Sequence, residues 1–142
     1  MTISKQLVLE KMALSQGHLI EAREILDSMT DKEILESRPY LHTLERYLQL
    51  IVDAILDINN HLIKEIDLEP AKDLKSTFNI LADNKILDKD FAQKISNVVG
   101  LRNLIVHQYE KVDNEKFLED FRKHNSDFDE YFKYITSYLN RT

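Results

Sequence analysis

Hydrophobic residues recur every three or four positions through most of the chain, which is the spacing of an amphipathic α-helix. The pattern predicts helices over residues 3–27, from Pro39 to shortly before Pro70, over 71–83, over 88–107, and from Asp113 onward. The second of these helices has the longest stripe, and neighbouring apolar residues widen it. We therefore expect it to be central and packed on more than one side. Its stripe is Leu41, Leu44, Leu48, Ile51, Ile55, Ile58 and Leu62, widened by Val52, Leu56 and Ile63.

Local signals mark where several of these helices begin. Thr30 to Glu33 has the sequence of a capping box, in which a hydroxyl and a carboxylate bond the free amides of a new helix. Pro39 suits a first helical turn, and Asp88 suits the N-cap of the helix over 88–107. In the first helix, the predicted apolar face includes Leu7, Leu14 and Ile25.

The composition favours an all-α fold. The 142 residues include only two glycines and two prolines, too few for a fold of strands and tight turns. Short connections between long amphipathic helices favour antiparallel neighbours. We expect one domain over residues 1–142, an up-down bundle of about four to five helices.

Charge and composition also limit the classes of partner. The formal net charge of −6 argues against a broad basic face, so we expect no DNA partner, although a small basic cleft acting on RNA stays possible. The sequence has no cysteine and no stretch near the ~20 apolar residues of a membrane span. We expect a soluble, cytoplasmic protein without a membrane partner.

One segment interrupts its own apolar pattern. In the stripe Phe91, Ile95, Val98, Arg102 and Ile105, an arginine occupies a position where an apolar residue is expected. A guanidinium among apolar neighbours is costly unless it is paired or faces a cleft or a subunit interface.

A second row beside this stripe is small or polar throughout: Ser96, Gly100, Asn103 and His107. Glycine within a helix costs about 1 kcal/mol relative to alanine, so Gly100 predicts a close approach by another backbone or by a ligand. The two rows together predict a polar groove in an apolar helix face.

Arg102 and His107 lie about 140° apart on a regular helix. Two geometries bring them together: the helix ends near His107 and the chain turns, or a second subunit contributes its own pair. Asn103 and His107 are four positions apart and can touch directly. Taken alone, the spacing also fits a salt-bridged arginine and a histidine that interacts with a helix C-terminus.

The segment from Arg102 to Tyr109 resembles the Arg-Asn-x-x-x-His-x-Tyr signature of the HepT-like branch of HEPN proteins and matches every fixed position. The stretches 57–61 and 78–81 resemble that branch as well, and the similarity covers about residues 40–117.

This resemblance implies a helical homodimer in which the motifs of both subunits line one cleft and cleave RNA without a metal. It implies a partner, a minimal nucleotidyltransferase antitoxin of the MntA type, which silences the toxin by attaching AMP to the motif tyrosine. Carried over to this sequence, the catalytic residues are Arg102 and His107, and the modified residue is Tyr109.

The chemistry of these residues suits that role. RNA supplies its own nucleophile, the 2′-hydroxyl, so cleavage needs a proton-transfer group and positive charge at the phosphorus. Histidine, with an ordinary pKa of about 6.5, supplies the first, and arginine supplies the second. Asn103 either orients His107 or caps helix carbonyls. We expect no cofactor and no metal, because His18, His42, His61 and His124 lack ligand spacing.

Other features stay open at this stage. Asp57 and Asn60 either support the motif from the second long helix or lie on its solvated flank. The aromatic run from Phe117 to Tyr138 follows core periodicity, so we expect core or dimer packing in preference to base stacking. Two competing functions are a non-catalytic HEPN module that binds a nucleotide or a nucleotidyltransferase, and a structural dimer in which Arg102 pairs with an acid across the interface.

Overall fold

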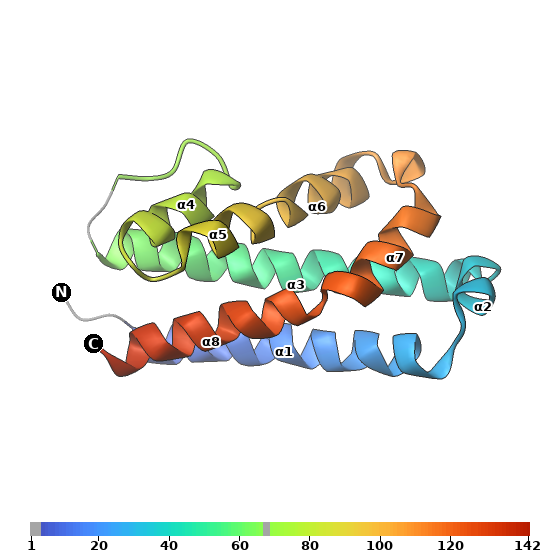
Figure 1. The fold of residues 1–142 in the computed structure, drawn as a ribbon, viewed down its shortest axis with the longest axis horizontal. Coiled ribbons are helices and arrows are strands. Elements are labelled where there is room, and N and C mark those ends of the chain that lie inside the picture. Colours follow the sequence, from blue (N-terminus) through green and yellow to red (C-terminus); the bar gives the residue numbers. More distant parts are fainter. Residues whose placement is uncertain (1–3, 67–68) are drawn as a thin grey trace.

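The computed structural model describes residues 4–66 and 69–142, and the elements within those ranges are helices. The prediction of an all-α bundle is confirmed (Figure 1). In chain order the elements are α1 (Lys5–Ser28), α2 (Asp31–Leu35), α3 (Arg38–Glu65), α4 (Ser76–Asp83), α5 (Lys89–Ile95), α6 (Val98–His107), the 3₁₀ helix η1 (Tyr109–Lys111), α7 (Asn114–His124) and α8 (Ser126–Asn140).

Two long helices, α1 and α3, form the base of the bundle and run antiparallel side by side (Figure 1). The short helix α2 joins them, and α8 runs along α1, to which the Arg23–Asp129 ion pair joins it (Figure 1). Helices α4, α5 and α6 follow one another along α3 (Figure 1). None of the described helices is both long and apolar enough to cross a membrane.

Helix α3 is the central helix, as its wide stripe predicts. All ten apolar residues named for that stripe are buried. Most of the aromatic run of α7 and α8 is buried too, including Phe117, Phe121, Phe128 and Tyr131. Both segments therefore contribute to one continuous core.

Helix α1 buries a different face from the predicted one. Leu7 and Leu14 are 38% and 52% exposed, and Ile25 is half-buried. Apolar residues occur on several sides of this helix, so periodicity alone does not identify the inner side. The buried row includes a polar residue, Ser15, whose hydroxyl donates to the Ile51 carbonyl (3.2 Å). That row is Val8, Met12, Ser15, Leu19, Ala22 and Leu26.

Several helix boundaries differ from the prediction. Ile3, where the sequence places the first helix start, lies outside the described residues. Helix α4 begins at Ser76, not at residue 71, because the Asp73 carboxylate accepts a hydrogen bond from the Ser76 amide (2.8 Å) in a local turn. The Thr30–Glu33 capping box and the Asp88 cap are confirmed.

Two helices predicted as continuous are each divided in two. The helix over 88–107 breaks after Ile95, where Ser96 donates its hydroxyl to the Gln93 carbonyl (2.8 Å) and the following amides bond three residues back. The last helix breaks at Asn125, whose side-chain amide donates to the Phe121 carbonyl (2.7 Å). Apolar spacing continues across both breaks, which is why the pattern did not reveal them.

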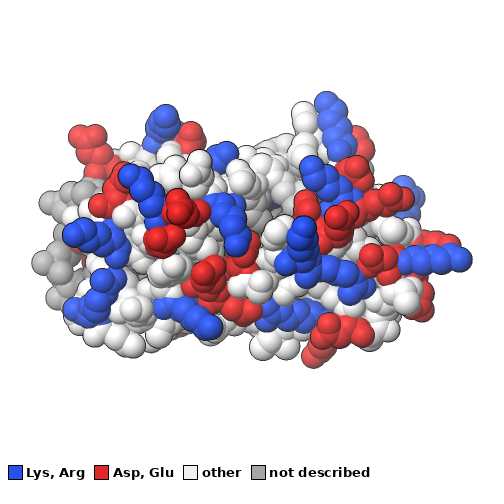
Figure 2. Space-filling model, in the orientation of Figure 1, with Lys and Arg blue, Asp and Glu red and all other residues white. Residues whose placement is uncertain are grey.

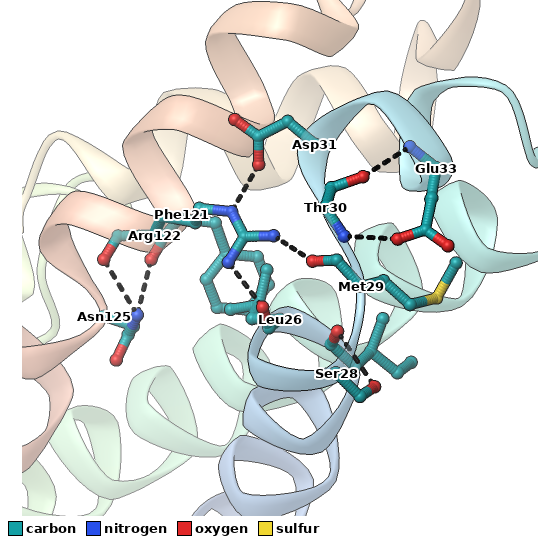
Figure 3. A network of polar contacts seen from close by, with 10 residues as sticks. Leu26, Ser28, Met29, Thr30, Asp31, Glu33, Phe121, Arg122 and Asn125 are labelled. Atoms are coloured by element: carbon teal, nitrogen blue, oxygen red, sulfur yellow. Dashed lines mark hydrogen bonds and ion pairs between the residues drawn. The ribbon is translucent and has the colours of Figure 1, made fainter.

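Polar side chains join the elements at two places. In the core, Tyr131 donates to Asn59 (2.6 Å), and Asn59 donates to Thr77 (3.0 Å). At the turn between α1 and α2, the Arg122 guanidinium of α7 donates to the carbonyls of Leu26 (2.5 Å) and Met29 (2.7 Å) and pairs with Asp31 (Figure 3). This second network fixes α7, and with it the connection from α6.

Candidate functional site

Helix α6 carries the motif and packs against α3. Val99 and Ile105 are its buried residues. Arg102 also faces α3, at the polar margin of this contact, where its Nε donates to Asp53 Oδ1 at 2.7 Å. The side chains of Arg102 and Asp53 are 19% and 33% exposed, so the ion pair is partly shielded from solvent. The arginine that interrupts the apolar stripe is thus paired within its own chain.

A second contact fixes the guanidinium plane. Arg102 Nη1 donates to Oδ1 of the adjacent Asn103 at 2.9 Å. The guanidinium has five N–H donors, and these two contacts leave its Nη2 group without a partner among the described residues. Asn103 therefore orients Arg102. The structure records no contact between Asn103 and His107, the pairing that their spacing allowed.

Helix α6 ends at His107, one of the two geometries that the sequence analysis considered. Gln108 bonds back to the Leu104 carbonyl (2.8 Å) and has φ −146° and ψ 49°, so the chain leaves the helix there. The exposed imidazole of His107 lies in the last turn of α6. The structure records no direct contact between His107 and Arg102.

The small, polar row beside Arg102 is mostly a surface. Gly100, Asn103 and His107 are exposed, whereas Ser96 is buried at the helix break. A side-chain carbon added at Gly100 would meet nothing within 4 Å, so the predicted close approach of another backbone does not occur within the chain. The row is an open face of α6.

Tyr109 follows this face in η1 and is 62% exposed. Its ring stands edge-on to the imidazole of His42, in the first half of α3, with ring centroids 6.5 Å apart and planes at 83°. His42 Nδ1 in turn lies 3.1 Å from Glu45 Oε1. The turn after α6 therefore brings the motif tyrosine to the start of α3.

Asp57 and Asn60 lie on the exposed side of α3. Asp57 forms an ion pair with Lys11 of α1 at 3.0 Å, and the structure records no contact from either residue to the motif. This placement favours the solvated-flank interpretation, and a supporting role stays a prediction.

The sequence pattern did not predict Asp53, His42 or Glu45 as residues of the site. Asp53 lies one turn before Asp57 and differs from it only in facing α6 instead of α1. That difference depends on how α3 and α6 pack, which no local pattern encodes. Glu45 did leave a signal, because a carboxylate near a wide apolar stripe is unusual.

The surroundings of the motif are open. A hollow of about 310 Å³ lies where the α5–α6 and α7–α8 breaks meet, and half of the residues that line it are apolar, among them Ile95, Val98 and Phe121. Arg102, His107 and Tyr109 do not line it.

Over α7 and α8, basic and acidic side chains are interspersed on the face shown in Figure 2. Within residues 4–66 and 69–142, no three His, Cys, Asp or Glu side chains are grouped so as to hold a metal ion.

Comparison with solved structures identifies the fold. The chain superposes on a tri-AMPylated HEPN toxin of Shewanella oneidensis, in complex with an MNT antitoxin, with a TM-score of 0.85 and 20% identity. The match covers 92% of this chain and 97% of the toxin. The bundle that presents the motif at the end of α6 is therefore a HEPN fold.

Sequence comparisons identify the family. The profile of the ribonuclease HepT-like family matches residues 16–135, so the chain belongs to the HepT-like family. It is 26% identical over 139 residues to the tRNA nuclease HepT of Aphanizomenon flos-aquae, covering 98% of this chain and 95% of that protein. It is 27% identical over 88 residues to the mRNA nuclease HepT of Shewanella oneidensis, covering 62% of this chain and 66% of that protein.

Proposed function

We propose that this chain is a metal-independent endoribonuclease toxin, with Arg102 and His107 as its catalytic residues. The observation that carries the proposal is the state of Arg102: two contacts fix its guanidinium, while its Nη2 group stays available. A pre-oriented guanidinium suits a phosphate that gains charge during the reaction. The names of its relatives, which are nucleases, agree with this chemistry.

The reaction uses the 2′-hydroxyl of RNA as the nucleophile. Its oxygen attacks the adjacent phosphorus, the 5′-oxygen of the next nucleotide leaves, and a 2′,3′-cyclic phosphate or its hydrolysis product results. His107 transfers a proton in this step, and Arg102 stabilises the charge on the phosphoryl oxygens. The exposed position of His107 allows a long substrate to reach it.

We propose that the cleft is completed in a homodimer. The structure records no contact between Arg102 and His107 within one chain, and the exposed row beside Arg102 on α6 has open space at Gly100. A second copy facing this row would place its own motif opposite the first. Mixing inactive Arg102→Ala chains with inactive His107→Ala chains tests this geometry, because a shared cleft predicts restored cleavage.

The partner that we propose is a minimal nucleotidyltransferase, which transfers AMP to Tyr109. The solved Shewanella toxin is described as AMPylated and in complex with an MNT antitoxin. Tyr109 is 62% exposed and two residues from His107, so an added nucleotide would put a bulky anion beside the catalytic pair. Mass spectrometry after co-expression should show added units of about 329 Da that Tyr109→Phe abolishes.

The test of the catalytic role of Arg102 compares two substitutions. Arg102→Ala should abolish RNA cleavage, whereas Arg102→Lys keeps the charge but loses the planar fork and should retain a small part of it. Cleavage by Arg102→Ala at the wild-type rate would contradict the assignment.

One alternative function keeps specific support. A non-catalytic HEPN module that binds a nucleotide or a nucleotidyltransferase agrees with the net charge of −6 and with the interspersed charges of Figure 2. Nucleotide or partner binding without RNA cleavage would favour it. The other alternative is a structural dimer with Arg102 paired across the interface. The ion pair of Arg102 with Asp53 of the same chain argues against it, and loss of RNA cleavage in folded Arg102→Ala would exclude it.

A further inference from the structure

Glu45 is a buried carboxylate that the proposed cleavage reaction does not use. Its side chain is only 6% exposed, and its recorded hydrogen bond within the described part of the chain joins it to Nδ1 of His42, 3.1 Å away and three residues earlier in α3. Burying a carboxylate costs free energy unless a hydrogen bond or an opposite charge compensates for it. The hydrogen bond to His42 therefore compensates for the burial of Glu45.

This hydrogen bond determines how the imidazole of His42 is oriented. When Glu45 is ionised, its carboxylate only accepts, so the proton in this hydrogen bond is then the one on Nδ1 of His42. In the neutral imidazole, Nε2 is then the atom with a free lone pair. The His42 side chain is 53% exposed, so the edge away from Glu45 is accessible. Carboxylates hold histidine bases in this way in hydrolases.

The group next to this imidazole is the motif tyrosine. The Tyr109 ring stands edge-on to the His42 ring, with centroids 6.5 Å apart. Two other tyrosine hydroxyls are occupied: Tyr47 donates to Glu21 (2.7 Å) and Tyr131 donates to Asn59 (2.6 Å). The Tyr109 hydroxyl has no such partner among the residues that the structure describes. With 62% exposure, its side chain has room to turn toward His42.

We propose that His42, oriented by Glu45, is the base that activates Tyr109 for AMP transfer. The inference rests on the proposed function, because it assumes that a partner nucleotidyltransferase brings a nucleoside triphosphate to Tyr109. A tyrosine hydroxyl must lose its proton to attack phosphorus, and a base held by a third group is the usual arrangement for activating a nucleophile. The toxin thus supplies part of the chemistry of its own inactivation.

The step balances with these groups. The Tyr109 oxygen forms a bond to the α-phosphorus, and the bond from that phosphorus to the pyrophosphate oxygen breaks. The electron pair of the broken bond leaves with pyrophosphate. The phenolic proton moves to Nε2 of His42, and the carboxylate of Glu45 stabilises the resulting imidazolium. His42 is then a catalytic residue of the transfer, and Glu45 is a positioning residue.

The experiment measures the rate of AMP addition to the full chain by its partner nucleotidyltransferase and ATP, using intact-mass spectrometry. His42→Ala should slow the transfer by about 10²- to 10⁴-fold, the range for loss of a general base. His124→Ala is the matched control, because His124 is 50% exposed and lies three residues from an acid, Asp127, outside the site. This control should be modified at the wild-type rate.

Two rescue experiments distinguish a catalytic base at His42 from a residue that only packs against Tyr109. Imidazole added to His42→Ala should restore part of the rate. Replacing Tyr109 with a fluorotyrosine, whose hydroxyl ionises more readily, should reduce the effect of His42→Ala. Binding of each variant to the nucleotidyltransferase is measured in parallel, so that lost affinity is not taken for lost chemistry.

The outcomes are distinct. If wild-type Tyr109 is modified and His42→Ala is modified equally fast, or is slow without either rescue, the inference about His42 is overturned while the proposed function stands. If wild-type Tyr109 is never modified, the AMP-transfer part of the proposed function fails, and this inference fails with it. Slow transfer to His42→Ala at unchanged affinity, with rescue, supports the inference.

Discussion

Replacing Asp53 tests whether the orientation of Arg102 matters for RNA cleavage. Asp53→Ala removes both the charge and the oxygen that accepts from Arg102 Nε at 2.7 Å. Asp53→Asn keeps an oxygen acceptor in that place but removes the charge. The two substitutions therefore separate the hydrogen bond that aims the guanidinium from the ion pair that stabilises it.

The expected cost in stability follows from the exposure of the pair. Exposed ion pairs contribute about 0–1 kcal/mol, and loss of one partner of a fully buried pair costs about 3–5 kcal/mol. With side chains 19% and 33% exposed, Arg102 and Asp53 lie between these limits. We expect Asp53→Ala to lower the free energy of unfolding by about 1–2 kcal/mol, and Asp53→Asn by less.

The expected effect on cleavage is larger than the effect on stability. A displacement of about 1 Å in a catalytic group can cost about 10²-fold in rate. Without Asp53, only Asn103 holds the guanidinium, so Asp53→Ala should slow RNA cleavage about 10- to 100-fold. Single-turnover cleavage of a labelled RNA, beside urea unfolding of the same samples, measures both effects.

A matched ion pair provides the control. Asp129 of α8 pairs with Arg23 of α1 at 2.5 Å, with side chains 45% and 32% exposed. Asp129→Ala should lower stability by a similar amount and leave the cleavage rate unchanged. If Asp53→Ala and Asp129→Ala cleave RNA equally fast, the orientation of Arg102 by Asp53 has no part in the reaction.

Three further predictions concern the fold. Burial raises the pKa of Tyr131 in the folded chain. Above about pH 10 the tyrosine ionises in the unfolded chain while it stays neutral in the folded one, so the free energy of unfolding falls as the pH rises further. Tyr131→Phe should cost about 1–2 kcal/mol at neutral pH and make the alkaline decline in urea-unfolding free energy shallower; an unchanged decline would contradict this account. Gly100→Ala should raise the free energy of unfolding by about 0.5–1 kcal/mol in dilute protein, because the new methyl group meets open space, and lower stability would show that the site is crowded. Arg122→Met strands the Leu26 and Met29 carbonyls and should cost about 2–3 kcal/mol in urea unfolding; a loss below about 0.5 kcal/mol would show that the turn is held by other contacts.

The sequence predicted the central helix well and the helix breaks poorly. The stripe of α3 has one wide apolar side, so periodicity alone identifies its buried residues. The breaks at Ser96 and Asn125 depend on side chains that bond nearby carbonyls, and they leave the apolar spacing intact. In α1, apolar residues on several sides made Leu7 and Leu14 look like core residues, although they are exposed.

The residues of the site, too, could be predicted only in part from the sequence. The motif from Arg102 to Tyr109 and the turn after His107 could be anticipated, because they lie in one continuous segment. The partners of that segment could not. Asp53 and His42 belong to α3, about 50 and 67 positions earlier than the residues they face, and only the packing of the helices brings them there.

The most direct test of the account is RNA cleavage by purified protein in excess EDTA, with wild type and His107→Ala compared at equal concentration and the product ends identified. The account predicts that wild type cuts without added metal and leaves 2′,3′-cyclic phosphate or its hydrolysis product, and that His107→Ala does not cut. Cleavage by His107→Ala at the wild-type rate, or wild-type cleavage that EDTA abolishes, would contradict it.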